Sequence, residues 1–189
     1  MGTNIQSIAN FYKDKDLSGL EIQTLIGKPP TLYYTIPQYS FNQLFPDNAP
    51  FQIFLLDTTA ARYGHYVSTF ITPTQIFYYD SYGLGGPDSY KQYTPYDQRY
   101  GPLLLNLLKS DPKKRPIVSN TVDMQSWKPN TSTCGRWSSL RIMYRHLDNE
   151  QFHSLFRNNS GAMSNKDILA TILTLNALND VPAYFESQK

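Results

Sequence analysis

The order of two apolar patterns constrains this fold more than any other feature of the sequence. Short runs of aromatic and β-branched residues, typical of strands, lie within residues 31–79, whereas apolar residues at helical spacing dominate after residue 97. Strands concentrated ahead of helices indicate an α+β fold. With 189 residues, no internal repeat and no Pro-rich linker, the chain is expected to form one domain spanning residues 1–189.

Local signals place the predicted elements. Asp16 or Ser18 caps a helix that opens the fold, and Gly27 with the following proline pair ends it. Ser40 caps a single helical turn. The predicted strands are residues 31–35, 51–56, 66–71, 75–79 and 116–119, of which 66–71 and 75–79 form a β-hairpin. Residues 82–96 form a surface loop, and the later helices are residues 97–109, 133–147, 149–156 and 164–178, the last beginning with a Ser-x-x-Asp cap.

Composition and charge exclude several classes of protein. Hydrophobic residues make up 40% of the chain and charged residues 17%, which is unlike a disordered protein. A net charge of +2 does not favour nucleic acid or a membrane as the default partner. Cys134 is the only cysteine, so no intramolecular disulfide can form. No secretion signal or membrane span is recognisable, and the chain is therefore expected to be intracellular.

Cys134 is the candidate nucleophile. Thr131, Ser132 and Thr133 supply capping residues directly before a predicted helix, so Cys134 lies in its first turn. Free backbone N–H groups and the helix dipole favour a thiolate there. Gly135 costs about 1 kcal/mol relative to alanine in a helix, which suggests that it lets a substrate backbone approach the sulfur. The alternative is an inert buried cysteine, which more often lies in the middle of a helix.

His65 and Asp80 are the candidate base and orienting acid. His65 lies at the start of the first hairpin strand, and Asp80 ends the second. A two-residue turn at 72–73 pairs His65 with Asp80, whereas a turn centred at 73.5 pairs residue 67 with Asp80. Both registers place the two side chains on one face. A carboxylate there would orient the imidazole for proton transfer; the alternative is a Gly-His turn and an Asp that caps a strand.

The other polar candidates carry weaker signals. His146 and His153 lie among charged residues of predicted helices, so both are expected on the solvated surface. Gln125 lies in an irregular segment nine residues before Cys134. Its amide N–H is of the type that stabilises the oxyanion of acyl transfer. Glutamine is common on surfaces, so this assignment depends on the other candidates.

The series His65, Asp80, Gln125 and Cys134 resembles the adenovirus-type (adenain) and SUMO-protease-like cysteine peptidases. The motifs that carry the resemblance are Gly-His-Tyr around His65, Phe-Tyr-Tyr-Asp-Ser-Tyr-Gly around Asp80, and Thr-Cys-Gly-Arg-Trp around Cys134. The resemblance covers residues 65–147. Residues 17–57 look like the leader of maturation proteases of large double-stranded DNA viruses and virophages. Papain-type peptidases carry these residues in the opposite order.

The resemblance implies a catalytic site and a fold. It makes Cys134 the nucleophile, His65 the general base and acid, and Asp80 the residue that orients His65. Gln125 and the backbone N–H of Cys134 would form the oxyanion hole. The family's fold is α+β, with a mixed β-sheet that carries His65 and Asp80, flanking helices, and a central helix that carries Cys134. No metal and no cofactor are implied.

Two departures from the family pattern bear on specificity and regulation. Members usually have tryptophan after the catalytic histidine, whereas this chain has Tyr66, which keeps an aromatic wall of different shape. Adenovirus protease is activated by a peptide linked through a second cysteine. Since Cys134 is the only cysteine here, activation through a disulfide cannot operate.

Three functions follow from these residues. The first is a monomeric peptidase that matures viral capsid or core protein precursors, cutting after small residues such as glycine, in the host cytoplasm or viral factory and in the virion. The second is a protease that removes a ubiquitin-like modifier, with an acetyltransferase on the same triad as a distant variant. The third is nucleic-acid binding, alone or as an accessory DNA contact of the peptidase, through Lys109, Lys113, Lys114 and Arg115. Such a run is more often a solvated loop.

Overall fold

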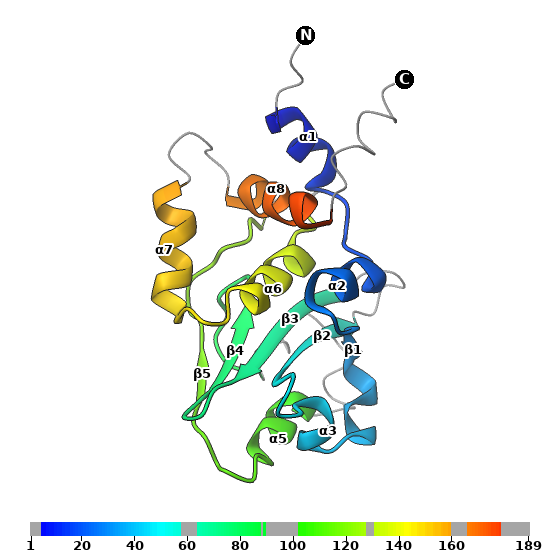
Figure 1. Ribbon diagram of the computed structural model, residues 1–189, viewed down its shortest axis with the longest axis vertical. Helices are drawn as coiled ribbons and strands as arrows, with labels where there is room; N and C mark the ends of the chain where they lie inside the picture. Colours follow the sequence, from blue (N-terminus) through cyan, green and yellow to red (C-terminus); the bar gives the residue numbers. More distant parts are fainter. Residues whose placement is uncertain are drawn as a thin grey trace.

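A five-stranded mixed sheet organises the chain (Figure 1). The structure is a computed structural model that describes residues 5–57, 64–87, 89, 102–127, 131–159 and 166–178. The strands are β1 (Thr31–Leu32), β2 (Phe51–Asp57), β3 (Gly64–Ile71), β4 (Ile76–Asp80) and β5 (Ile117–Ser119), in that order across the sheet. The two outer pairs are parallel, and β2, β3 and β4 are antiparallel. The expected α+β class is confirmed.

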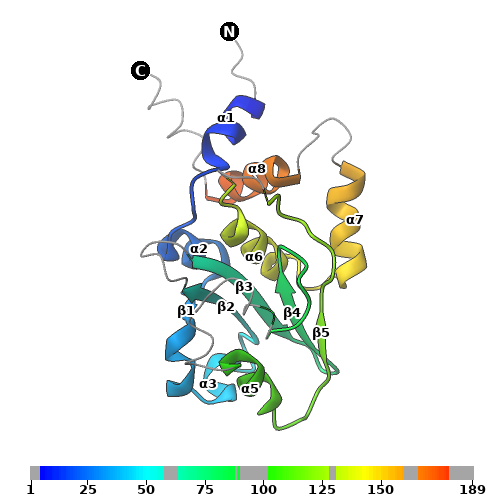
Figure 2. The ribbon, with the colours of Figure 1, turned by 180° about the vertical axis from the view of Figure 1, so that it is seen from behind.

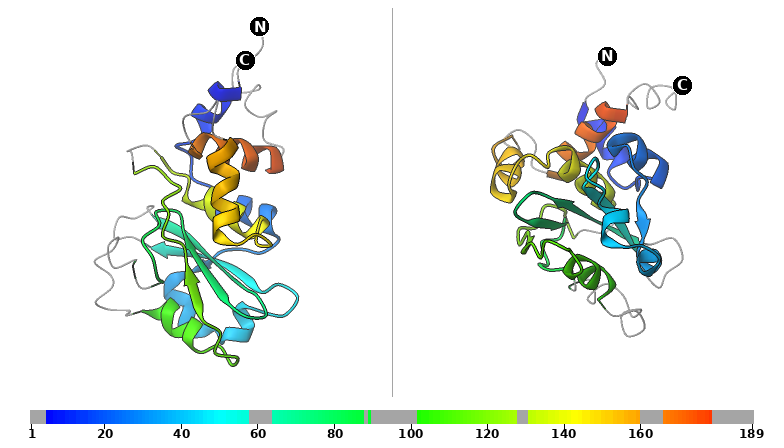
Figure 3. Two further views of the ribbon diagram at one scale, coloured as in Figure 1. Left: turned by 90° about the vertical axis from the view of Figure 1, so that its left-hand side faces the viewer. Right: turned by 60° about the horizontal axis from the view of Figure 1, so that its bottom comes forward.

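Helices flank this sheet. α2 and α6 pack on one face with α7 and α8 beyond them, whereas η1, α3 and α5 pack on the other, as the right-hand view of Figure 3 and the rear view of Figure 2 show. The helices are α1 (Ile5–Tyr12), α2 (Gly19–Ile26), the 3₁₀ helix η1 (Tyr33–Gln38), α3 (Phe41–Leu44), α5 (Leu103–Lys109), α6 (Cys134–Met143), α7 (Asn149–Asn159) and α8 (Lys166–Leu178). Within the described ranges, no helix has the length and apolar character needed to cross a membrane.

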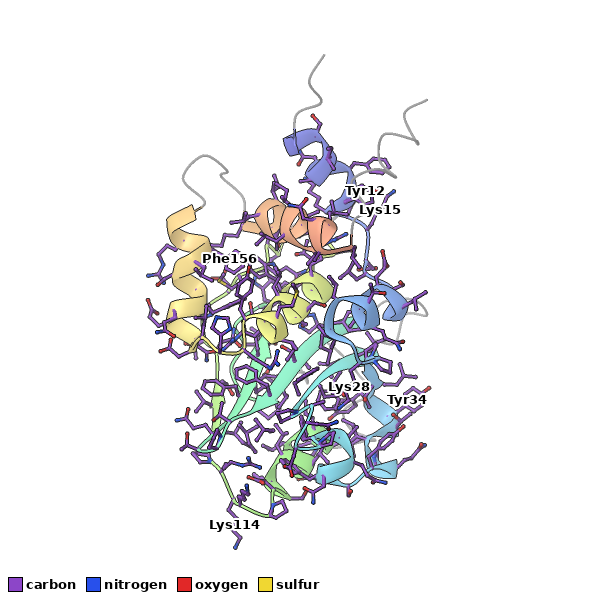
Figure 4. The ribbon with its side chains drawn as sticks, in the orientation of Figure 1. Tyr12, Lys15, Lys28, Tyr34, Lys114 and Phe156 are labelled. Atoms are coloured by element: carbon purple, nitrogen blue, oxygen red, sulfur yellow. The ribbon has the colours of Figure 1, made fainter. Side chains whose placement is uncertain are left out.

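Strand alternation divides the apolar core in two. Val67 and Tyr78 pack with η1, α3 and α5, whereas Tyr66 and Phe70 pack with α2 and α6. A further apolar cluster lies between α6 and α7. In it Phe156 of α7, labelled in Figure 4, lies against the Trp137 indole of α6 at 4.6 Å between ring centroids. Because both faces of the sheet are covered, its central strands have nearly continuous apolar sequences.

Most predicted elements are confirmed, and one strand is shorter than expected. Ser18 and Ser40 form the capping boxes of α2 and α3. The strand expected at 31–35 ends at Leu32. There the chain turns into η1, in which the Thr35 hydroxyl donates to the Leu32 carbonyl oxygen at 2.7 Å. A β-branched residue can therefore be held in a helical turn by its own hydroxyl.

Two helix predictions need correction. The helix expected at 133–147 ends at Met143, because the buried Arg141 guanidinium donates to the carbonyl oxygens of Tyr144 and Leu147 and holds a turn there. The opening helix is α1 rather than α2, and α1 was not predicted although its apolar residues have helical spacing. Residues 88, 90–101 and 164–165, parts of a predicted loop and of two predicted helices, lie outside the described residues.

The β3–β4 hairpin has the second of the two expected registers. Val67 pairs with Asp80, so His65 is a diagonal neighbour of Asp80 on the same face. Thr72 closes the turn: its hydroxyl donates to the Gln75 carbonyl oxygen at 3.1 Å and accepts the Gln75 N–H at 3.0 Å. The predicted proximity of His65 and Asp80 thus follows from the turn.

Gly83 brings the chain after β4 against the segment that carries Gln125. Its φ is +66°, and a Cβ there would lie 2.5 Å from the carbonyl carbon of Val122. Beside it, the Gln125 N–H donates to the Ser81 carbonyl oxygen at 3.0 Å. The two segments are therefore in backbone contact, and glycine is the residue that permits it.

Replacing Gly83 with alanine is expected to reduce the free energy of unfolding by about 2–5 kcal/mol, since φ strain and a clash with backbone add up. Gly85 is the matched control, because its φ is +94° but no atom of the described residues lies within 4 Å of a Cβ there. Gly85→Ala should therefore cost only the strain, about 1–2 kcal/mol. Urea unfolding of both variants gives the comparison, and equal losses would contradict the close approach.

Candidate active site

Cys134 is the first residue of α6 and is 5% exposed. Thr133 is the N-cap residue as expected, yet its side chain makes no capping hydrogen bond. Its hydroxyl donates instead to the Asp167 carboxylate of α8. The backbone N–H of Cys134 lies among the first N–H groups of the helix, which have no partner within it. The thiol thus lies beside N–H groups that have no partner within the helix.

Gly135 has a different role from the expected one. A Cβ at this position would lie 3.2 Å from the Tyr66 ring and 3.3 Å from the Cβ of Leu17. The side-chain position is therefore filled by the protein core rather than open to a substrate. Glycine here allows α6 to pack closely on β3 and on the chain before α2.

His65 and Asp80 are in direct contact. His65 Nε2 lies 2.8 Å from Asp80 Oδ1, and both side chains are buried. The same Asp80 oxygen accepts the Tyr82 N–H at 2.9 Å, while the Asp80 N–H donates to Asn120 Oδ1 at 2.8 Å. The Asp80 carboxylate is thereby held by Tyr82 as well as by His65, and its backbone is held by Asn120.

The imidazole of His65 has two acidic neighbours. Burial by itself lowers its pKa, but hydrogen bonds and charge interactions with Asp80 and Cys134 overcome this effect and raise the pKa to about 9. Because Nε2 is bonded to Asp80, Nδ1 is the ring nitrogen left for the thiol. At neutral pH the imidazole is therefore protonated, next to both the sulfur and the carboxylate.

Tyr82 is a site residue that the sequence reasoning did not single out. Its ring stacks on the imidazole of His65 at 5.0 Å between centroids and on the indole of Trp127 at 3.9 Å. Burial and the nearby Cys134 raise the pKa of its hydroxyl to about 12, so the phenol stays neutral. Trp127 is 57% exposed and forms the outer layer of this stack. The position of Tyr82, two residues after Asp80, was the available signal.

Gln125 lies at the site in a defined orientation. Its side-chain oxygen accepts the Ser81 hydroxyl at 2.8 Å. Its Nε2 donates to the Tyr82 hydroxyl at 3.1 Å and to the Thr131 carbonyl oxygen at 3.2 Å. The amide is thus bonded to the loop after β4 and to the segment before Cys134, so the structure brings together all four residues chosen from the sequence.

The two remaining histidines differ from each other. His146 is exposed, as expected, but the expectation for His153 is wrong, because it is 4% exposed on α7. Burial and the nearby Arg141 lower the pKa of His153 to about 4. Its ring adjoins Phe152, at 6.2 Å between centroids, and faces the core. Flanking charges in the sequence did not reveal this inward side of α7.

The basic run lies far from the candidate site. Lys114 projects at the end of the molecule opposite α1 and α8 (Figure 4). Lys109 and Lys113 are exposed beside it, whereas Arg115 is paired with the buried Asp111 at 2.7 Å. Three lysines therefore face solvent at this tip.

Nowhere in the described chain do three His, Cys, Asp or Glu side chains form a group that could bind a metal ion.

Comparison with known proteins relates the chain to a virophage protein. No protein-family model matches the chain. It is similar to "Uncharacterized protein V9" of Sputnik virophage, with 35% identity over 104 residues that cover 52% of this chain and 58% of that protein. The chain thus spans less than two thirds of the length of this relative. The similarity indicates a viral connection and carries no information on activity.

The raised pKa of His65 predicts how stability changes with pH. The pKa of about 9 in the folded protein exceeds the ordinary value of 6.5. The contribution of protonated His65 to the free energy of unfolding is therefore complete below pH 6.5 and is lost as the pH rises through 9. Urea unfolding at pH 6.5 and 9.5 should show this loss. Asp80→Asn should flatten the dependence, whereas His146→Ala should leave it intact. The same pH dependence in the Asp80 variant would contradict the contact.

Proposed function

We propose that this protein is a cysteine endopeptidase that uses Cys134, His65 and Asp80 as its triad. The observation that carries the proposal is one buried imidazole bonded both to a carboxylate and to a thiol at the start of a helix. This combination favours a thiolate next to an imidazolium, which is the reactive form of cysteine nucleophiles. The resemblance to adenain-type peptidases agrees with it, whereas the virophage relative indicates only a viral connection.

The chemistry follows from the two sides of the imidazole. The Cys134 thiolate attacks the scissile carbonyl carbon and forms a C–S bond. As the tetrahedral intermediate collapses, the C–N bond breaks and the His65 imidazolium gives its proton to the leaving amine. Water then attacks the thioester with neutral His65 as base, which releases the acid and restores the ion pair. Asp80 stabilises the imidazolium throughout.

Two donors serve the oxyanion in this proposal. The Cys134 backbone N–H is free of helical partners, and Gln125 Nε2 is oriented through the Ser81 hydroxyl. In the ligand-free protein both Nε2 hydrogens are engaged, one with Tyr82 and one with Thr131. The Thr131 acceptor is a backbone carbonyl, whereas the Tyr82 hydroxyl belongs to a side chain. The substrate oxygen therefore takes the place of the Tyr82 hydroxyl.

The proposed substrates are capsid or core protein precursors of a virus. This choice depends on the resemblance to maturation proteases and on the viral relative. Incubation with such proteins and mass spectrometric mapping of the new termini tests it. New N-termini that follow glycine support maturation, whereas release of an intact ubiquitin-like modifier would replace maturation by deconjugation. DNA contact through the three exposed lysines remains a separate prediction, read out by salt-dependent binding.

Cys134→Ala and His65→Gln are each expected to abolish peptide hydrolysis. The first removes the nucleophile, and the second removes the imidazole that is bonded to both the thiol and the carboxylate. His65 is bonded to a buried carboxylate, so its variant also loses stability, and activity must be expressed per folded molecule. His146→Ala, at the exposed histidine, should keep full activity. Hydrolysis by either triad variant would contradict the mechanism.

Gln125→Ala is expected to slow acylation of Cys134 by about 10²–10³-fold, because one oxyanion donor is lost. Acylation by p-nitrophenyl acetate passes through a tetrahedral oxyanion, whereas alkylation by iodoacetamide does not. Alkylation should therefore hardly change. Gln38→Ala, at an exposed glutamine of η1, is the matched control and should leave both reactions unchanged. Equal losses in the two reactions would instead assign Gln125 a role in the local fold.

A further inference from the structure

A second buried carboxylate lies next to the candidate site and takes no part in the triad. Asp167, in the first turn of α8, is 1% exposed. Its Oδ1 accepts the Thr133 hydroxyl and the Trp137 indole N–H, the latter at 2.8 Å, and its Oδ2 accepts the Ser126 backbone N–H at 2.9 Å. From the sequence this residue was assigned only to a helix cap.

The positions of these donors are informative. Ser126 directly follows Gln125, and Thr133 directly precedes Cys134. One carboxylate of α8 therefore bonds to both segments that carry the oxyanion donors. All three donors are neutral, so the buried charge is stabilised by hydrogen bonds that are strong because the acceptor is ionised. Through these bonds Asp167 links the two segments to each other and to α8.

We propose that Asp167 is a positioning residue that sets the spacing between the Gln125 amide and the Cys134 backbone N–H. This inference rests on the proposed peptidase function, in which both groups bind the same oxyanion. A displacement of about 1 Å at a reacting centre costs on the order of 10² in rate. The backbone bonds between the Gln125 segment and Ser81 do not by themselves set the distance from Gln125 to Cys134. A shared anchor on the packed helix α8 does.

Asp167→Asn is expected to break the hydrogen bond to the Ser126 segment and to keep those to α6 and Thr133. The retained oxygen can still accept from Thr133 and Trp137, whereas the new NH₂ group faces the Ser126 N–H and cannot accept from it. The Gln125 segment should shift while Cys134 stays in place. Asp148→Asn is the matched control, because Asp148 is exposed and lies in the chain before α7.

The experiment compares two reactions of the full chain. For Asp167→Asn, acylation by p-nitrophenyl acetate is expected to fall about 10²-fold per folded molecule, with alkylation by iodoacetamide unchanged. The pH dependence of acylation should keep its midpoint, since His65 is untouched. Hydrogen exchange of the Ser126 amide should accelerate, while the Trp137 indole N–H keeps its NMR signal. Asp148→Asn should alter none of these.

Other outcomes overturn the inference. Unchanged acylation would show that the spacing does not depend on Asp167. Equal losses of acylation and alkylation would show that Asp167 only supports the fold around Cys134. Failure of the proposed function is recognisable by itself, because wild-type protein would then neither acylate at Cys134 nor hydrolyse any peptide. In that case the role of Asp167 in an oxyanion hole falls as well.

Discussion

The register of β3 against β4 is the constraint on which the candidate site depends. Pairing of Val67 with Asp80 places His65 on the same face, 2.8 Å from that carboxylate. Because side chains alternate along a strand, a slip by one residue would put His65 and Asp80 on opposite faces. The same slip would exchange Val67 and Tyr66 between two differently packed clusters. Apolar packing on both faces of the sheet therefore fixes the register that brings His65 into contact with Asp80.

α6 carries Cys134, and the position of this helix on the sheet is also set by polar contacts. Nine of its ten residues are buried, among them two arginines. Arg136 donates to the Thr174 hydroxyl of α8 at 2.8 Å. It also donates, at longer range, to the carbonyl oxygens of Tyr12 and Lys15, which are labelled at the top of Figure 4. Buried polar groups that bond several elements fix a helix more narrowly than apolar packing, because hydrogen bonds have directional geometry.

The site contains two buried carboxylates that do different work, because their partners differ. Asp80 faces a titratable imidazole and helps to raise the pKa of His65 to about 9, so it acts on the protonation state of the site. Asp167 faces a hydroxyl, an indole and a backbone N–H, none of which titrates near neutral pH. These hydrogen bonds position the segments that donate them, while the Asp167 charge also helps to raise the pKa of Tyr82. Asp80→Asn therefore tests the protonation state of His65, and Asp167→Asn tests the distance between the two oxyanion donors.

The sequence by itself determined the features that depend on neighbouring residues. A cap at Asp16 or Ser18 follows from spacings of a few residues, and the same-face placement of His65 and Asp80 follows from one short turn. Only the tertiary structure decided the choice between two registers, the core contacts that require Gly135, and the partners of Asp167, which lie 30 to 41 residues away along the chain. The physical reason is that periodicity and capping are local, whereas the distance between two segments is set by how α6 and α8 pack on the sheet.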